Sequence, residues 1–313
     1  MEVAILNPEY EHSEVIGTFL EVFSALKCKI ILFSHNQGHR RWEAFYQKYI
    51  PKKVFERRSP NHFVSQANRF KCIVSITGSG SERAYISQLS QTIKDKMLYV
   101  IHIKGHVQGY MKHKVVLSPY VRDDTKITDI YPIYKIPRWP AYTCNKRINF
   151  VTVGSNRCGK KLADFTKMGH RNSKFRFNMI LSGKYADSHF VRNVKQIGGP
   201  NTIQMMEIMK KSHFVVPLLN EKGWHVGTHQ HGVRLSGTLP LAMICQRPMI
   251  IQKHINDKYY LKGNITFNKS ITEVEKRLQK MTNEEYKKLV KEVKNQLKAR
   301  IQRNTKIIKS LMF

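Results

Sequence analysis

Short apolar runs alternate with amphipathic segments over the first 120 residues. Runs typical of buried strands cover residues 3–6, 29–33, 70–76, 97–103 and 114–118. Apolar residues recur at helical spacing over residues 13–27, and helices are also predicted over 41–49 and 82–93. Apolar strands separated by helices predict a mostly parallel sheet that is covered on both faces.

The pattern stops and then restarts. Between about Ile130 and Arg147 the chain carries Pro132, Pro137 and Pro140 with little periodicity, which indicates a domain connection. Strands are then predicted over 148–153, 177–181, 214–219 and 249–251, and helices over 203–210, 239–245, 272–280 and 282–308. For the last helix, Thr282 and Glu285 predict a capping box. Its apolar stripe is Tyr286, Leu289, Val293, Leu297 and Ile301.

The stretch 213–254 contains many of the residues that could bind a ligand. A buried strand is followed by a Gly- and His-rich loop at 220–232. The helix that comes next has Pro240 in its first turn and is expected to have a hydroxyl cap from the preceding Ser236–Thr238 segment. Strand, loop, helix and strand form a βαβ unit, and a loop that ends at a helix N-terminus suits an anion.

Charge limits the choice of partner. Lysine and arginine number 54 against 22 acidic residues, a formal net charge of +32. Such a field favours nucleotide phosphates, DNA or an anionic membrane surface without choosing among them, and an ordinary solvated basic surface is an equal alternative. The five scattered cysteines form no CxxC pair, which indicates a reducing compartment. With neither a signal peptide nor an apolar run near the roughly 20 residues of a bilayer span, we expect a soluble, cytoplasmic protein.

Two local sequences carry a family resemblance: GSNRCGKK after the strand that opens the second half, and SGTLPLAMICQRPMII at 236–251. With their order and spacing, nearly the whole chain resembles the GT-B glycosyltransferases. The resemblance implies two Rossmann-like α/β domains that face a cleft. Residues 1–135 would bind the acceptor and 136–290 the nucleotide-sugar, while 291–313 would form a C-terminal helix that crosses back to the first domain.

The resemblance also implies which residues bind the donor, a UDP- or GDP-sugar co-substrate, with no bound cofactor. Small residues let backbone N–H groups approach a diphosphate, and arginine can bind it bidentately. The implied donor-binding residues are Gly154, Ser155, Arg157, Ser182, Gly183, His231, Arg234, Ser236, Gly237 and Thr238.

One departure from the family affects the mechanism. Many retaining members carry a ribose-binding glutamate in the helix that matches 239–244, whereas this chain has only apolar residues there. The chain is therefore expected to invert the anomeric centre without a metal, using one general base. Candidates at the ends of first-domain strands are His102, His106 and Glu82, with His35 and His39 behind them. His102 resembles, by position, the catalytic aspartate of phage DNA β-glucosyltransferases. Each lone histidine also fits a surface or satisfied core position.

Other interpretations stay open. His225, His229 and His231 could bind a metal, but no nearby aspartate or cysteine completes a set, and an exposed polar loop explains them equally well. Tight turns alone would explain the glycines at 78–80 and 154–159. Three function classes remain: a transferase acting on a glycan or glycoconjugate, a DNA-modifying glucosyltransferase, and a non-catalytic nucleic-acid-binding protein. Nothing in the sequence specifies the oligomeric state.

Overall fold

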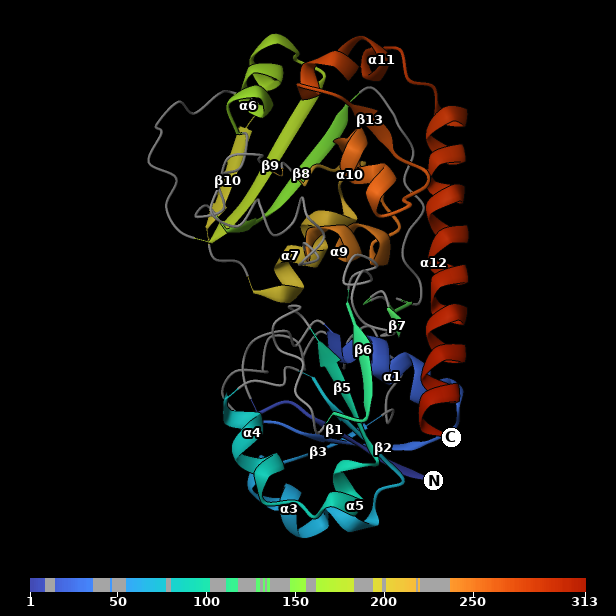
Figure 1. The fold of residues 1–313 in the computed structure, drawn as a ribbon. Coiled ribbons are helices and arrows are strands. Elements are labelled where there is room, and N and C mark those ends of the chain that lie inside the picture. The colour runs from blue at the N-terminus through green and yellow to red at the C-terminus, as the bar shows by residue number, and fades with distance from the viewer. Residues whose placement is uncertain are drawn as a thin grey trace. The chain divides into compact units, whose positions relative to one another are not determined.

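The computed structural model describes residues 1–8, 15–35, 46, 55–76, 80–101, 111–117, 128–129, 132, 134–135, 147–155, 162–182, 194–198, 201–217, 219 and 237–313. The chain forms two compact units. Unit 1 comprises Met1–Pro137, His231–Leu235 and Ala299–Phe313, and unit 2 comprises Arg138–Gln230 and Ser236–Lys298. Each unit is built on a parallel sheet with helices on its faces (Figure 1).

Unit 1 contains a seven-stranded sheet in the order β3-β2-β1-β4-β5-β6-β7, with every neighbouring pair parallel. Its strands are β1 (Glu2–Leu6), β2 (Lys29–Phe33), β3 (Phe55–Arg58), β4 (Cys72–Ser75), β5 (Met97–Ile101), β6 (His113–Val116) and β7 (Thr128–Asp129). The first six follow the Rossmann order 3-2-1-4-5-6, in which the chain reverses direction across the sheet between β1 and β4. The parallel sheet expected from the apolar runs is confirmed.

The helices of unit 1 cover both faces of this sheet. Those in the described residues before position 102 are α1 (Ile16–Ala25), η2 (Pro60–His62), α3 (Phe63–Gln66), η3 (Ala67–Arg69), α4 (Gly80–Ser87) and α5 (Gln91–Lys94). On one face Phe33 packs edge-on against Phe63 and Phe70, with ring centroids 5.3 and 5.7 Å apart. The single helix predicted over 82–93 is wrong. Extended backbone at Ser90 separates α4 from α5, so the apolar positions lie on two short helices.

Unit 2 repeats the same order of strands. They are β8 (Ile148–Ser155), β9 (Phe175–Ser182), β10 (Val194–Gly198), β11 (Phe214–Val215), β12 (Ile250–Gln252) and β13 (Ile265–Phe267). One sheet runs β10-β9-β8-β11, and a parallel bridge between Val215 and Met249 continues it to the β12-β13 pair. The Rossmann reversal therefore falls between β8 and β11.

Before α12, the described part of unit 2 contains the helices α6 (Leu162–Arg171), α7 (Thr202–Lys210), α9 (Thr238–Ile244), α10 (Lys253–Lys258), η7 (Ile271–Val274) and α11 (Glu275–Gln279). The helix predicted over 272–280 begins as the 3₁₀ segment η7, because the Ser270–Glu273 capping box tightens its first turn. The strand predicted over 214–219 is shorter, since its ladder ends before Pro217.

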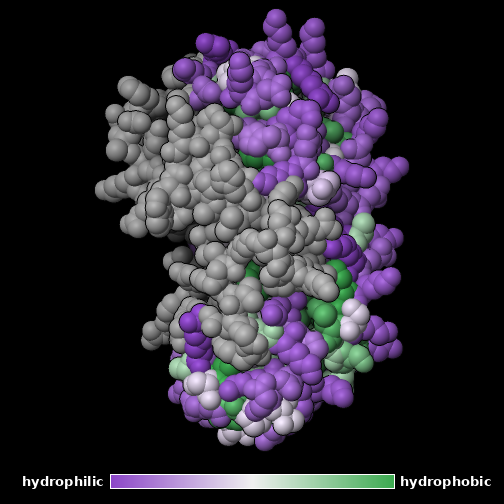
Figure 2. Space-filling model, in the orientation of Figure 1, coloured by the Kyte–Doolittle hydropathy of each residue, from purple (hydrophilic) through white to green (hydrophobic). Residues whose placement is uncertain are grey.

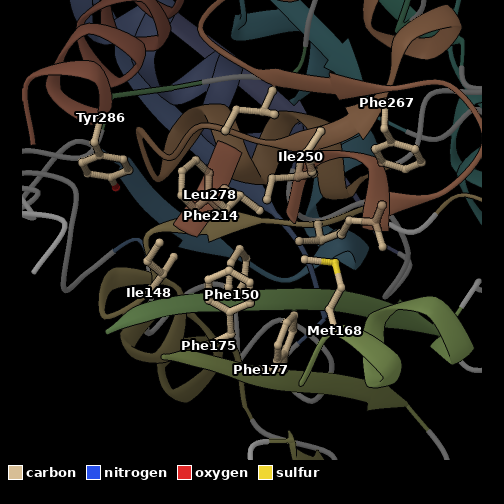
Figure 3. Close-up of a cluster of buried hydrophobic side chains, with 14 of the residues drawn as sticks. Ile148, Phe150, Met168, Phe175, Phe177, Phe214, Ile250, Phe267, Leu278 and Tyr286 are labelled. Carbon is tan, nitrogen blue, oxygen red and sulfur yellow. The ribbon is translucent and has the colours of Figure 1, made fainter. Parts of the chain in front are cut away.

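An aromatic cluster forms the core of unit 2 (Figure 3). Phe150 of β8 stacks on Phe177 of β9 with ring centroids 4.7 Å apart, and Phe175 meets it edge-on at 5.2 Å. Phe214 of β11 stacks at 5.8 Å. These side chains hold three neighbouring strands at fixed spacing, and thereby fix where their carboxyl ends lie.

The C-terminal helix α12 runs from Asn283 to Met312. The predicted capping box is confirmed, because Thr282 N donates to Glu285 Oε2 at 2.9 Å and Glu285 N donates to Thr282 Oγ1 at 3.2 Å. The predicted apolar stripe faces inward: Tyr286, Val293 and Leu297 are buried. The Tyr286 hydroxyl also donates to the carbonyl of His213 at 2.9 Å, which ties the start of α12 to β11.

Candidate functional site

The carboxyl edge of the unit 2 sheet is the first place to look for a ligand. In open parallel sheets, ligands bind outside the carboxyl ends of the strands where the strand order reverses. That point lies between the ends of β8 and β11. One sequence feature that carries the family resemblance begins there, since Gly154 and Ser155 are the last residues of β8, and the other contains α9, the next described helix after β11.

Three of the predicted donor residues lie side by side at this edge. In the ladder between β8 and β9, Gly154 pairs with Leu181 and Ser155 pairs with Ser182. Gly154, Ser155 and Ser182 are therefore the last residues of two adjacent parallel strands. Their positions agree with a shared role in holding one ligand at the carboxyl edge.

The predicted helix start also reaches this edge. The hydroxyl of Thr238, buried in the first turn of α9, donates to the carbonyl of Val153 at 3.1 Å. This bond fixes the beginning of α9 at the end of β8. The expected hydroxyl cap on α9 is wrong: the cap residue is Gly237, which has no side chain, and the Thr238 hydroxyl bonds to the strand instead.

The other predicted donor residues are Arg157, Gly183, His231, Arg234 and Ser236, and all of them lie outside the described residues. The same holds for His102, His106, His39, His225 and His229. Their roles stay predictions.

Glu82 and His35 are the described members of the predicted bases. Glu82 lies on α4, is fully buried, and accepts hydrogen bonds from the Ser75 hydroxyl and from Ile76 N, the latter at 3.2 Å. The carboxylate therefore fastens α4 to the end of β4, beside the reversal point of unit 1. Both carboxylate oxygens are thus occupied by bonds within unit 1, which suits a positioning residue, and a role for Glu82 as the base stays a prediction. His35 is exposed two residues after β2.

Two polar residues that the sequence interpretation passed over lie at the same edge of unit 1. Asn7 follows β1 and Ser34 follows β2, and both are buried at 0% and 1% exposure. The available signal was a polar side chain directly after a buried strand.

Among the described residues, no group of three or more histidine, cysteine or acidic side chains is arranged to hold a metal ion. A search of the described helices for one long and apolar enough to cross a membrane finds none.

No protein-family model matches the sequence, and no curated protein matches it. Solved structures do match along the whole chain. Anabaena Alr3699/HepE in complex with UDP-glucose aligns with a TM-score of 0.61 at 11% identity, covering 99% of each chain. S. aureus TarM, in complex with fondaparinux, α-GlcNAc-glycerol and UDP, aligns at 0.60 and 8% identity, again over 99% of each chain. AviGT4, a glycosyltransferase of avilamycin A biosynthesis, aligns at 0.58 and 10% identity, over 100% of this chain and 98% of that one. The chain has the fold of these proteins, the GT-B fold with two Rossmann-like domains.

Proposed function

We propose that the protein is a glycosyltransferase that moves a sugar from a nucleotide diphosphate donor to an acceptor hydroxyl on a glycan or glycoconjugate. The observation that carries the proposal is the convergence of Gly154, Ser155, Ser182 and Thr238 at the reversal point of unit 2. Two structures of the same fold, Alr3699/HepE and TarM, are described with UDP-glucose or UDP. UDP is therefore the first donor nucleotide to test.

In this proposal the donor diphosphate lies at the carboxyl edge of the unit 2 sheet. The backbone after Gly154 and Ser155 approaches the phosphates closely, since small side chains leave the N–H groups accessible. Arg157 and Arg234 neutralise the diphosphate as it leaves, which gives the metal-independent stabilisation that the sequence favours.

The chemical step is an inverting displacement. The acceptor oxygen attacks the anomeric carbon, the bond from that carbon to the diphosphate oxygen breaks, and the nucleotide leaves with the electron pair. A general base takes the hydroxyl proton, and His102 and His106 are the proposed bases, since an imidazole with a pKa near about 6.5 suits neutral pH.

Thermal shift in metal-free buffer tests the donor site. UDP, GDP, CMP and their sugars are titrated, and one nucleotide diphosphate is expected to raise the melting temperature, because it binds only the native state. Arg157→Ala and Arg234→Ala should abolish most of the shift. Arg176→Ala is the matched control, since Arg176 is exposed on β9 and pairs with Asn149 near the opposite end of the strands. If Arg157→Ala and Arg234→Ala both kept the full rise in melting temperature, the proposed donor site would be wrong.

Turnover tests the base. His102→Ala and His106→Ala should each be compared with wild type for kcat and for donor affinity. Replacing the true base should lower kcat about 10²- to 10⁴-fold and leave donor affinity unchanged. Two variants with wild-type turnover would exclude both histidines.

A polyanionic partner is the second candidate, and one surface favours it. Lys287, Lys291, Lys294 and Lys298 are exposed on α12 at spacings of four, three and four residues, so they lie in one row. None of them forms a salt bridge with a residue in the described part of the chain. Hydrophilic residues project along the side where α12 runs (Figure 2).

Salt-dependent binding tests that candidate. Duplex DNA and vesicles with 30% anionic lipid are compared at low and high NaCl, with neutral vesicles as reference. A fourfold Lys→Gln variant of the row should lose binding, because like charges in a row attract a polyanion through counterion release. Gln at the exposed Lys262, Lys269, Lys276 and Lys280 is the charge-matched control. Equal binding by both variants would mean that net charge alone is responsible.

A further inference from the structure

The carboxyl edge of unit 1 holds a buried amide that has no hydrogen-bond partner among the described residues. Asn7 follows β1 directly, and its backbone N donates to the carbonyl of Phe33 at 2.9 Å, so it still belongs to the ladder. Its side chain is fully buried. Neither amide atom, Nδ2 or Oδ1, has a hydrogen-bond partner in the described part of the chain.

Ser34 lies beside it on the next strand. Its backbone N donates to the carbonyl of Arg58 at 3.0 Å, and its buried hydroxyl likewise lacks a partner among the described residues. Leu6 pairs with Phe33 in the register, so Asn7 and Ser34 are the next neighbouring positions. Leu6 and Phe33 both belong to the cluster on one face, and side chains alternate along strands. Asn7 and Ser34 therefore face the opposite side of the sheet together.

Helix α1 covers that opposite side. It contacts β1 and β2, and its first turn carries Thr18, whose buried hydroxyl is a third group without a hydrogen-bond partner among the described residues. Nearby on the same helix, the N–H of Gly17 is satisfied by the Tyr46 hydroxyl at 3.0 Å. Three groups without partners among the described residues thus belong to α1 and to the positions that follow β1 and β2, two strands that α1 contacts.

Burying a polar group without a partner is costly, so native proteins keep few such groups. The cost is tolerated at sites where a ligand supplies the missing bonds. Asn7 also lies at the reversal point of a Rossmann-ordered sheet, where ligands bind. The position of Asn7 and its missing hydrogen bonds are independent observations, and both indicate a ligand site.

We propose that Asn7 and Ser34 recognise hydroxyl groups of an uncharged sugar on the acceptor. An asparagine amide offers both a donor and an acceptor, which match two neighbouring hydroxyls, and a serine hydroxyl matches a third. Neither side chain carries a charge, so the pair suits a neutral sugar. This inference rests on the proposed transferase function and adds the chemical class of the acceptor group.

Stability gives the first test, and it needs no acceptor. Asn7→Leu keeps the approximate volume and removes the unpaired amide, so the melting temperature should rise by about 2–4 °C. Asn264→Leu is the matched control. Its amide is paired, accepting from Met249 N at 2.8 Å and donating to Asn256 Oδ1 at 3.0 Å, so the same substitution should lower the melting temperature. Equal losses for both variants would overturn the proposal, because the Asn7 amide would then be satisfied in the free protein.

Transfer to simple acceptors gives the second test. The p-nitrophenyl glycosides of glucose, galactose and N-acetylglucosamine are offered with the donor that the thermal-shift screen identifies. For Asn7→Leu, KM for the accepted glycoside should rise at least about tenfold, with a smaller rise for Ser34→Ala. An unchanged KM, or a wild-type protein that accepts none of the glycosides, would overturn the neutral-sugar assignment.

The two failures can be distinguished. If no nucleotide stabilises the wild-type protein, the transferase function fails, whereas the Asn7 and Asn264 pair still reports whether the amide is unsatisfied.

Discussion

The two sheets follow the same strand order, but the polar groups at their reversal points differ. In unit 2 the Thr238 hydroxyl is bonded to the carbonyl of Val153, and the strand ends carry Gly154 and Ser155. In unit 1 the amide of Asn7 and the hydroxyl of Ser34 are buried without partners among the described residues. One edge is therefore built from backbone and small residues, and the other from neutral side chains. This difference suits a phosphate ligand in unit 2 and a sugar hydroxyl in unit 1.

The largest expected effect tests the scaffold of unit 2. Gly263 has a φ of +72°, and a Cβ there would lie 2.5 Å from Leu289 O and 2.9 Å from Val293 N of α12. Gly263→Ala combines backbone strain with overlap against a helix backbone, so we expect a loss of about 4 kcal/mol in the free energy of unfolding. Urea unfolding followed by circular dichroism measures it. Gly198→Ala is the control, since a Cβ there meets nothing within 4 Å.

The counterpart in unit 1 is Gly17, whose added Cβ would overlap the ring of Tyr134. Gly17→Ala should cost about 2 kcal/mol, less than Gly263→Ala, because a side chain can shift more readily than a helix backbone. The same urea experiment measures it. A double variant with Tyr134→Ala should recover part of the loss attributed to the overlap; no recovery would show that the ring is not the cause.

Removing the bond at the unit 2 edge should have a smaller effect. Thr238→Val keeps the shape of the side chain but removes the hydrogen bond from this hydroxyl to the Val153 carbonyl, at a cost of about 1 kcal/mol. Donor affinity should fall with it, since α9 is no longer fixed to the end of β8. Thr238→Ser should restore most of both quantities in a calorimetric titration with the donor nucleotide. If the valine variant bound the donor normally, this contact would not position the site.

The smallest effect concerns pH and lies away from either edge. Glu2 accepts hydrogen bonds and ion pairs from Lys29 and Arg69, both at 2.7 Å, and these cations lower the pKa of Glu2 to about 2. A carboxylate with a lowered pKa contributes stability above its ordinary pKa, near about 4.3, and that contribution is lost as the pH falls towards 2. Glu2→Gln should therefore lower the urea midpoint slightly at pH 7 and progressively less between pH 4.5 and 2. A difference that stayed constant over this range would contradict the ion-pair explanation.

The sequence predicted the buried interior of the fold well and its edges poorly. Val3–Leu6, Lys29–Phe33 and Ile148–Val153 are apolar runs in central strands, where burial on both faces selects such residues. Four strands were not predicted from the sequence, and each is an edge strand of its sheet: β3, β7, β10 and β13. The β3 sequence Phe55–Arg58 and the β10 sequence Val194–Gly198 contain polar residues, because an edge strand is partly exposed.

Some residues of the candidate sites could be predicted from the sequence and others could not. Glycine and serine after a strand, at Gly154, Ser155 and Ser182, are local signals that the family resemblance could use. Asn7 and Ser34 also follow strands directly, but their importance comes from missing hydrogen bonds and from the register of two strands, which the sequence does not show. Glu82 looked like an accessible acid in the sequence; its burial against Ser75 depends on tertiary packing.

Hydrogen exchange measured by mass spectrometry, with and without saturating UDP, tests the central claim most directly. The account predicts slower exchange in peptides that cover 153–161, 182–186 and 236–240, which contain the ends of β8 and β9, the start of α9 and the residues next to them in the sequence. Peptides that cover Asn7 and Ser34 should keep their exchange rates until an acceptor glycoside is added. Protection by UDP that was confined to the Asn7 and Ser34 peptides, or absent from unit 2 at a concentration that raises the melting temperature, would contradict the assignment of the donor to unit 2.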